Sequence, residues 1–289
     1  MALVTGAVLA VCGACLQGLF RNPLADPGLI GASSGASLGA VVAIVLFSGV
    51  APQVMDYGNT SNTFFYLLSR SSISLFAFLG SLVAIYTAYR LATTGGVTSV
   101  ATLLLAGIAV SAIASAGYGI FISLADDQEL RSITFWSLGS VAYVTWKEIV
   151  ISMIFAVLPS LMLLRYGNTL NLLTLGEKDA FYTGVNVQKH KKSLIVLIAI
   201  AVGTITSLAG IIAFAGIVAP HLTRILFGAD YKRILPLSML MGGILVSLAD
   251  LTSRVVIPPA ELPLGILTTA VGGPFFVSLL LGLRKKGRL

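Results

Sequence analysis

The chain has 289 residues, of which 57% are hydrophobic and only 10% are charged, and its formal net charge is +7 at pH 7. Soluble proteins carry about 25% charged residues, so this composition excludes a set of soluble domains and indicates a protein solvated mainly by lipid. The basic residues are scattered between apolar runs and form no stripe, which argues against nucleic acid as a partner.

The apolar runs predict nine membrane spans, because a spanning helix needs about 20 mostly apolar residues. In chain order they are 2–20, 33–49, 73–92, 97–121, 149–165, 193–213, 214–227, 235–257 and 264–283. Two of them, 33–49 and 214–227, are short for a full crossing. Half-length helices at membrane depth need a covering of protein or a water-filled cavity, so we expect both near whatever passes through. The expected fold class is all-α, a polytopic transmembrane bundle forming one domain over 1–289.

The distribution of lysine and arginine gives the orientation, since cytoplasmic loops are enriched in both. With a cytoplasmic C-terminus, alternation of the spans places 14 basic residues inside and four outside. The inner set is Arg21, Arg90, Arg165, Lys178, Lys189, Lys191, Lys192, Arg224, Lys232, Arg233, Arg284, Lys285, Lys286 and Arg288. The outer set is Arg70, Arg131, Lys147 and Arg254. We therefore expect the C-terminus to be cytoplasmic.

Nine spans with the C-terminus inside place Met1 outside, without the charged region or cleavage site of a signal peptide. An apolar N-terminus that starts outside suggests that a preceding helix is missing from this sequence. A weak internal echo is also present: Gly13 precedes Pro23 by ten residues, and Gly210 precedes Pro220 by ten. Each pair should end a long helix and open a short one. Because the two long helices run in opposite directions, the echo favours two inverted halves.

Residues 21–40, RNPLADPGLIGASSGASLGA, predict a tight corner followed by a closely packed helix. Pro23 and Pro27 cannot continue a helix, so the chain should turn at the cytoplasmic face. Gly31, Gly35 and Gly39 then follow at a four-residue spacing and should share one helix face. Small residues at this spacing let helix backbones approach closely in a membrane.

Three long motifs resemble those of a known family of transport proteins. LQGLFRNPLADPGLIGASSGASLGA (16–40) resembles the signature of the permease subunits of ATP-driven importers for iron-siderophores, haem and cobalamin, the FecCD-type permeases. GIIAFAGIVAPHLTRILFGADYKRILP (210–236) and LADLTSRVVIPPAELPLGILTTAVGGPFF (248–276) resemble its second and third signatures. Order and spacing match along the whole chain. Members of this family usually have ten spans, which fits a missing N-terminal helix.

The resemblance implies a set of partners in the bacterial cytoplasmic (inner) membrane. A second permease copy would complete a homodimer with the pathway at its interface. An ABC ATPase dimer would bind on the cytoplasmic side and use the ATP, and a soluble or lipid-anchored binding protein would deliver cargo outside. Spans 97–121 and 264–283 would line the pathway with the two short helices. Pro23, Pro27, Pro220 and the three glycines would then pack beside it.

The segment LGEKDAFYTGVNVQKHKK (175–192) is the longest polar stretch on the predicted cytoplasmic side. Gly176, Glu177, Ala180 and Gly184 resemble the short helix, glycine and second helix through which such permeases dock their ATPases, which makes about 170–192 the expected coupling region. The plainer interpretation is an ordinary basic loop. Since the 175–184 region is polar, we expect it to contribute little to apolar burial, so substitutions there should leave the membrane fold intact.

Arg254 follows Asp250 by four residues near the outer end of its span. The plain interpretation is an ion pair between successive helical turns. By resemblance, an arginine here pairs with a glutamate of the binding protein, and Asp250 could orient it. The partner arginines of the family's first outer loop would fall in the missing N-terminal part, which leaves docking by this chain an open question.

Several absences in the sequence bear on mechanism. The middle of each long span lacks ionisable residues, which argues against a proton- or ion-coupled carrier. The phosphate loop GxxxxGK[ST] is also absent, so ATP should be bound by a separate subunit and this chain should not be an enzyme. Cys12, Cys15 and His221 are expected to be structural, with His190 in a loop, so we expect no bound metal or cofactor. A secondary carrier or channel without an ATPase is the alternative, since inverted repeats would suit it equally.

The cargo is the least determined part of the prediction. The family moves large iron or cobalt chelates, so pathway walls with few specific polar groups are expected. TFWSLGSV (134–141) and PAELPLGILT (259–268) slightly favour haem over ferric siderophores, with cobalamin as a third candidate.

Overall fold

The computed structural model describes residues 1–47, 60–142, 144–257 and 261–285. Within these ranges every regular element is a helix apart from one small hairpin, which confirms the predicted all-α class. Some residues used in the sequence analysis fall outside the described ranges. They are the end of the span 33–49, Pro258, Pro259 and Ala260 of the third motif, and the C-terminal Lys286 and Arg288.

The helices follow one another along the chain with short connections. They are α1 (Ala2–Phe20), α2 (Ala32–Phe47), α3 (Thr60–Leu91), α4 (Val100–Leu124), α5 (Asp127–Leu138), α6 (Trp146–Ser152), α7 (Leu158–Leu163), α8 (Gly167–Leu175), α9 (Glu177–Tyr182), α10 (Val187–Ala209), α11 (Ala215–Phe227), α12 (Tyr231–Val255) and α13 (Leu264–Lys285). A π-helical turn, Met153–Val157, joins α6 to α7, and a 3₁₀ turn, Leu164–Tyr166, joins α7 to α8. Strands β1 (Thr93–Thr94) and β2 (Val97–Thr98) pair antiparallel.

Each of the nine predicted spans corresponds to an apolar helix. In the described part, six helices are long and apolar enough to cross a membrane, and α2, α11 and Leu264–Leu279 of α13 are shorter. Three boundaries were wrong. The span predicted over 73–92 belongs to α3, which begins at Thr60. The span predicted over 149–165 belongs to a longer helical stretch, Trp146–Leu175, because the π and 3₁₀ turns continue it. The span predicted over 193–213 ends at Ala209, since Gly210 adopts the positive φ of 69° that ends a helix.

Helix α5 was not predicted. It is a short amphipathic helix whose polar first turn hides it from a search for apolar runs. Asp126 accepts a hydrogen bond from the backbone N–H of Glu129, and the Glu129 side chain accepts one from the N–H of Asp126. This reciprocal capping box starts the helix.

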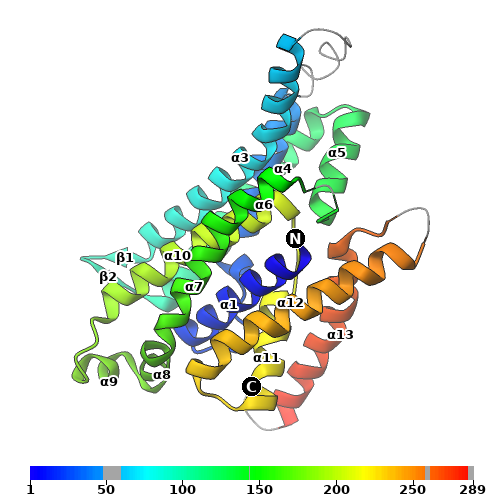
Figure 1. The fold of residues 1–289 in the computed structure, drawn as a ribbon. Helices are drawn as coiled ribbons and strands as arrows, with labels where there is room; N and C mark the ends of the chain where they lie inside the picture. Colours follow the sequence, from blue (N-terminus) through cyan, green and yellow to red (C-terminus); the bar gives the residue numbers. More distant parts are fainter. Residues whose placement is uncertain (48–59, 143, 258–260, 286–289) are drawn as a thin grey trace.

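Helix α1 lies in the middle of the bundle (Figure 1). Over an 18-residue window, 83% of α1 is buried, against 22% for α4. Glycines allow this enclosure, because a Cβ at Gly6 would collide with the backbone of Gly242 in α12, and a Cβ at Gly13 with the backbone of Gly216 in α11. The core of the protein is therefore built around one helix whose neighbours come mostly from the C-terminal half.

The two halves repeat the same order of elements. In each, a long helix (α1, α10) leads through a non-helical stretch into a short helix (α2, α11), followed by a long helix (α3, α12) and a further apolar helix (α4, α13). Gly18, near the end of α1, packs against Leu170 of α8, beside which α9 leads into α10. The end of α1 and the start of α10 thus lie at the same end of the molecule, so the halves are inverted.

The ten-residue spacing between glycine and proline, found once in each half, does not reflect this repeat. Gly13 lies inside α1, whereas Gly210 follows the end of α10. Pro23 lies in the corner before α2, whereas Pro220 lies within α11. Equal residue spacing therefore falls on non-equivalent positions, and the symmetry is one of element order only.

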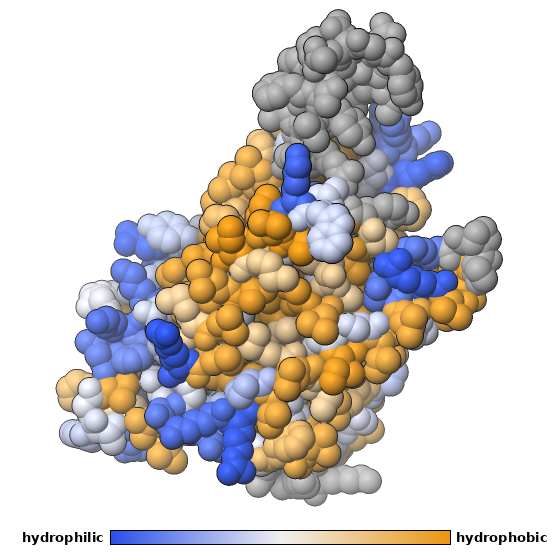
Figure 2. All heavy atoms as spheres, in the orientation of Figure 1, coloured by the Kyte–Doolittle hydropathy of each residue, from blue (hydrophilic) through white to orange (hydrophobic). Residues whose placement is uncertain are grey.

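An apolar band separates two polar ends of the molecule. Figure 2 shows hydrophobic side chains across the middle, with hydrophilic patches on either side. On α4 the band includes Leu105, Ile108, Ile113 and Ile120, all more than half exposed. Large apolar side chains in such numbers on the exterior require lipid or another protein surface. One polar end carries α8, α9 and the β1–β2 hairpin, and the other carries α5 and the α12–α13 connection (Figure 1).

Candidate functional site

The segment α8–α9 forms a compact corner at one polar end. Helix α9 starts at Glu177 and ends at Tyr182, and Gly184 then turns the chain toward α10. Gly184 has a φ of 86°, and its N–H donates to the carbonyl of Phe181 at 2.9 Å. Its position needs glycine because L side chains rarely adopt this conformation. Ala180 is fully buried beneath the helix, so α9 presents its other faces outward.

Two exposed aromatic side chains mark the outer face of α9. Phe181 is 68% exposed and Tyr182 is 83% exposed, with their ring centroids 6.1 Å apart. They border a shallow hollow of about 700 Å³ that also involves Glu177, Gly184 and Gln188. Exposed aromatics in a polar region are typical of protein–protein contacts. The sequence analysis missed both residues, although FY within the charged stretch EKDAFYTG was an available signal.

Glu177 is tied to the rest of the bundle through Lys191 of α10. The Lys191 Nζ lies 2.7 Å from the Glu177 Oε2 and donates to the carbonyl oxygen of Thr98 at 2.8 Å. Lys191 is only 1% exposed, whereas the Glu177 side chain is 41% exposed. The expectation that the 175–184 region buries little agrees with the structure, since Ala180 is its one buried residue, while Glu177 joins the region to α10.

Asp250 and Arg254, near the end of α12, form a second charged group with Glu261, which follows α12. This end of α12 lies at the opposite polar end of the molecule (Figure 1). The Arg254 guanidinium lies 3.2 Å from Asp250 and 3.4 Å from Glu261, so one cation joins the end of α12 to the connection before α13. The Arg254 side chain is 41% exposed. Arg254 is therefore ion-paired and exposed to solvent at the same time, as docking to a partner protein would require.

The predicted glycine face is real at two of its three positions. A Cβ at Gly35 would collide with the backbone of Gly80 in α3, and a Cβ at Gly39 with the backbone of Phe76. Gly31 is different, because it precedes α2 and has a φ of 87° at the end of the 3₁₀ turn Pro27–Ile30. Placing Gly31 on the α2 face was wrong. Its role is the left-handed corner that redirects the chain.

The corner before α2 is fixed by its own hydrogen bonds. Arg21 ends α1 with a φ of 51°, and Pro23 follows in the non-helical stretch. The Asp26 Oδ1 then accepts from the N–H of Gly28 at 2.8 Å, and Pro27 is the first residue of the 3₁₀ turn, where its missing N–H does no harm. The turn predicted from the two prolines is confirmed.

Pro220 and His221 lie in the short helix α11. Pro220 is buried as the sixth residue of that helix, so it packs within α11 and does not open it. The His221 ring packs edge-on against Phe275 of α13 with centroids 5.6 Å apart. Among the described residues, no group of three or more His, Cys, Asp or Glu side chains could hold a metal ion.

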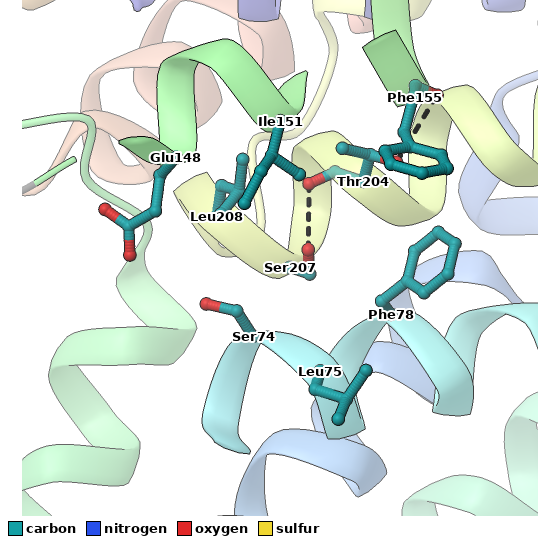
Figure 3. Close-up of a pocket in the computed structure, with 9 residues that line it drawn as sticks. All are labelled: Ser74, Leu75, Phe78, Glu148, Ile151, Phe155, Thr204, Ser207 and Leu208. Carbon is teal, nitrogen blue, oxygen red and sulfur yellow. Dashed lines mark hydrogen bonds between the residues drawn. The ribbon is translucent and has the colours of Figure 1, made fainter. Parts of the chain in front are cut away.

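A separate recess of about 310 Å³ lies between α3, α6 and α10 (Figure 3). Leu75, Phe155 and Ile151 form much of its wall and are each about half exposed, so it opens on the apolar exterior. Its Thr204 and Ser207 hydroxyls donate to backbone carbonyls of α10 at 2.7 and 2.9 Å. With these hydroxyls already engaged by the backbone, the recess resembles a lipid-facing groove more than a cargo site.

The comparisons with known proteins agree with this arrangement. The model of the FecCD transport family matches residues 1–282. The chain belongs to this family. Its sequence is 41% identical over 287 residues to the hemin transport system permease protein HmuU of Yersinia pestis, covering 99% of this chain and 81% of that protein. It is 38% identical over 275 residues to the cobalamin import system permease protein BtuC of Halobacterium salinarum, covering 95% and 69%.

A solved structure supports the fold directly. An inward-facing metal-chelate type ABC transporter superposes with a TM-score of 0.81 at 33% identity, covering 98% of this chain and 84% of that one. The FecCD chain described here is thus a multi-pass membrane permease with the fold of an importer subunit. The resemblance carried by the three sequence motifs is confirmed.

Proposed function

We propose that this FecCD permease is the membrane subunit of an ATP-driven importer that moves a metal chelate into the cell. The proposal rests on helix α9, which is held rigidly at one polar end of a bundle typical of the family. This helix exposes aromatic side chains to solvent. Such a surface suits a partner protein that transmits its motion to the bundle. Gly176, Glu177, Ala180 and Gly184 would form the backbone of this docking element, and Phe181 and Tyr182 its contact face.

The orientation follows from the same assignment. The ATPase dimer would bind α9 on the cytoplasmic side and hydrolyse the ATP, and the C-terminus would lie on that side. The end with Asp250 and Arg254 would then face outward to receive the binding protein. Engineering a single cysteine at Lys189 tests this orientation. Labelling of that cysteine in intact cells by a membrane-impermeant reagent would overturn it.

A second copy of the chain would complete the pathway. Helix α4 exposes a row of large apolar side chains, and α13 exposes Val271 and Val277, so both have surfaces to place against a partner. Together with the short helices α2 and α11 they would line a passage between two copies. Gly35, Gly39 and Pro220 would support that wall from behind.

Haem is the cargo we propose first. The relative at 41% identity is named as a hemin permease, while another at 38% is named for cobalamin. Phe135 of α5 is 62% exposed at the end proposed to face outward, which suits a large flat aromatic chelate. The walls of α4 carry no charged residue along 100–124, as expected for a bulky chelate that needs few specific contacts.

A carrier or channel that works without an ATPase is disfavoured by family membership and by the lack of charged residues along α4. Co-purification decides the matter: we expect a stoichiometric ATPase to remain bound. Proteoliposomes holding the full complex and its binding protein should then take up haem with ATP hydrolysis. Competition by ferric siderophores or cobalamin at equal potency would overturn the haem assignment, and uptake without any ATPase would overturn the importer.

A further inference from the structure

We propose that Lys191 is a positioning residue that links the ATPase-docking helix α9 to helix α4, so that both move as one body. This inference rests on the proposed function, since it names the route by which α9 would act on the pathway. Lys191 lies in the first two turns of α10, between the α9 corner on one side and the β1–β2 hairpin on the other.

The first half of the link joins α9 to α10. The Lys191 Nζ and the Glu177 Oε2 are 2.7 Å apart, and Glu177 is the first residue of α9. A buried ammonium requires a charged or polar partner, because leaving it unpaired is strongly unfavourable. Movement of α9 away from α10 would therefore leave this buried cation without its carboxylate and with a neutral carbonyl as its remaining partner.

The second half of the link joins α10 to the hairpin. The Lys191 Nζ also donates to the carbonyl oxygen of Thr98 at 2.8 Å, and the N–H of Thr98 donates to the Gln188 Oε1 at 2.9 Å. Gln188 precedes Lys191 by three residues, so both side chains project from neighbouring positions on α10. Both backbone polar groups of Thr98 are thus held by a helix about 90 residues further along the chain.

The hairpin needs this support. Each of its strands has only two residues, and isolated two-stranded hairpins are marginal at best. Its own side-chain contact is the 3.0 Å pair between the hydroxyls of Thr93 and Thr98. Anchoring at Thr98 therefore positions the whole connection between α3 and α4.

Thr98 also lies next to the start of α4. Ser99 is the N-cap of that helix, and its Oγ accepts from the N–H of Thr102 at 3.3 Å. A displacement of Thr98 therefore displaces the cap and the first turn of α4. The route runs from α9 through Lys191 to Thr98 and into α4, a helix that the proposed function places beside the pathway.

An ordinary structural ion pair would make a different prediction. Its loss would lower stability without changing how much cargo is moved for each ATP hydrolysed. A link between moving parts adds a second effect, since α9 could then follow the ATPase while α4 stays behind. Measuring both effects therefore distinguishes a purely structural ion pair from a link between moving parts.

The test uses Lys191→Met, which keeps length and apolar stem but removes the charge, with Lys192→Met as the matched control. Lys192 is the exposed neighbour on the same helix, so it loses the same charge without touching Thr98. In the purified complex we expect backbone hydrogen exchange over residues 93–99 to rise about tenfold in Lys191→Met, corresponding to about 1.4 kcal/mol, and to stay unchanged in Lys192→Met.

The transport readout is cargo imported per ATP hydrolysed in proteoliposomes. We expect this ratio to fall at least about threefold in Lys191→Met, a difference of roughly 0.7 kcal/mol, while hydrolysis continues. Glu177→Gln is the milder variant if Lys191→Met folds poorly, and it should lower the ratio in the same direction. The link would be overturned if the Lys191→Met complex showed the same hydrogen exchange over residues 93–99, and the same cargo imported per ATP hydrolysed, as the Lys192→Met complex. A wild-type chain without ATP-driven uptake would instead overturn the proposed function.

Discussion

The two polar ends of the permease each hold one cation between carboxylate or carbonyl oxygens, but they hold it differently. Lys191 is buried and joins three elements, whereas Arg254 is 41% exposed and joins neighbouring parts of α12 and the α12–α13 connection. The buried cation fixes relative positions within the chain. The exposed cation keeps donor groups at the surface and can exchange partners.

This difference matches what each end is proposed to do. An element that transmits force must keep its position relative to its neighbours, and here the ammonium of Lys191 is buried, where its electrostatic contacts are stronger than in water. A site that binds and releases a soluble protein needs contacts that are individually weak, and exposed ion pairs contribute only about 0.2–1 kcal/mol. The following substitutions test the contrast, from the largest expected effect to the smallest.

Gly35→Leu, midway between the ends, should have the largest effect. The new side chain would meet the backbone of Gly80, which has no side chain to move aside. We expect a loss of stability of about 3 kcal/mol or more and little folded protein. Leu38→Ala on the same helix should lose about 1–2 kcal/mol. Folded yield from detergent extracts measures both, and a normal yield of active Gly35→Leu would refute close packing there.

Glu177→Arg should come next, because it brings a second cation to the buried Lys191 Nζ. We expect a loss of about 3 kcal/mol, measured by thermal denaturation in detergent, together with poor ATPase association. Glu177→Gln keeps a hydrogen-bond acceptor and should lose less. Equal stability of the Arg variant and wild type would show that this end tolerates charge change as the other end does.

Gly184→Val should act locally on the α9 corner. A β-branched residue at a φ of 86° is strained by about 1–2 kcal/mol, although the space around the glycine is open. We expect normal dimerisation but reduced uptake per ATP hydrolysed. Gly184→Asn is the control, since asparagine tolerates this conformation better. Identical coupling in the two variants would mean that the turn conformation is unimportant.

Arg254→Glu should change stability by less than about 1 kcal/mol, because Arg254 and Glu261 are both 41% exposed and Asp250 is only partly buried. Its effect should lie in capture of the binding protein, which we expect to weaken about tenfold, or roughly 1.4 kcal/mol. Surface plasmon resonance on the reconstituted permease measures this affinity. Arg131→Glu on α5 gives the same charge change nearby, so equal weakening by both would point to net charge and not to a specific contact.

The smallest effect concerns Asp230, which lies before α12 at the same polar end as α9. The Asn171 amide donates to its carboxylate at 2.6 Å, and this bond, with the N–H of Lys232, lowers the pKa of Asp230. A lowered pKa in the folded state means that the contribution is present above the ordinary value of about 4 and is lost as the pH falls through the lowered one. Asp230→Asn should therefore be slightly less stable than wild type at pH 7, and the difference should shrink as the pH falls below the ordinary value of about 4, as denaturation across this range would report.

Much of the fold could be predicted because hydropathy alone decides which segments of about 20 residues enter a membrane. All nine apolar segments were found this way, and α2 and α11 were recognised as short. Helix α5 was missed because an amphipathic 12-residue helix has no long apolar run. The Asp126–Glu129 capping box was the only sequence feature that indicated it.

Local sequence could not provide the contacts between distant elements. In the stretch KHKK the three lysines are alike, yet packing buries Lys191 alone and leaves Lys189 and Lys192 exposed. The four-residue glycine spacing likewise suggested one face, but the 3₁₀ turn after Pro27 places Gly31 in a corner instead. Residue types and spacing predicted which segments matter, and only the three-dimensional arrangement says what each side chain contacts.

The central position of α1 has a consequence for how the protein is made. Helix α1 leaves the ribosome long before α12, whose Gly242 must meet Gly6 roughly 240 residues later. At about 5–20 residues per second, α1 waits roughly 10–50 s in the bilayer without its final neighbours. Its uncharged sequence lets it remain there as a stable single helix during that time. The later helices therefore assemble around a segment inserted early, which acts as the template for the bundle during biosynthesis.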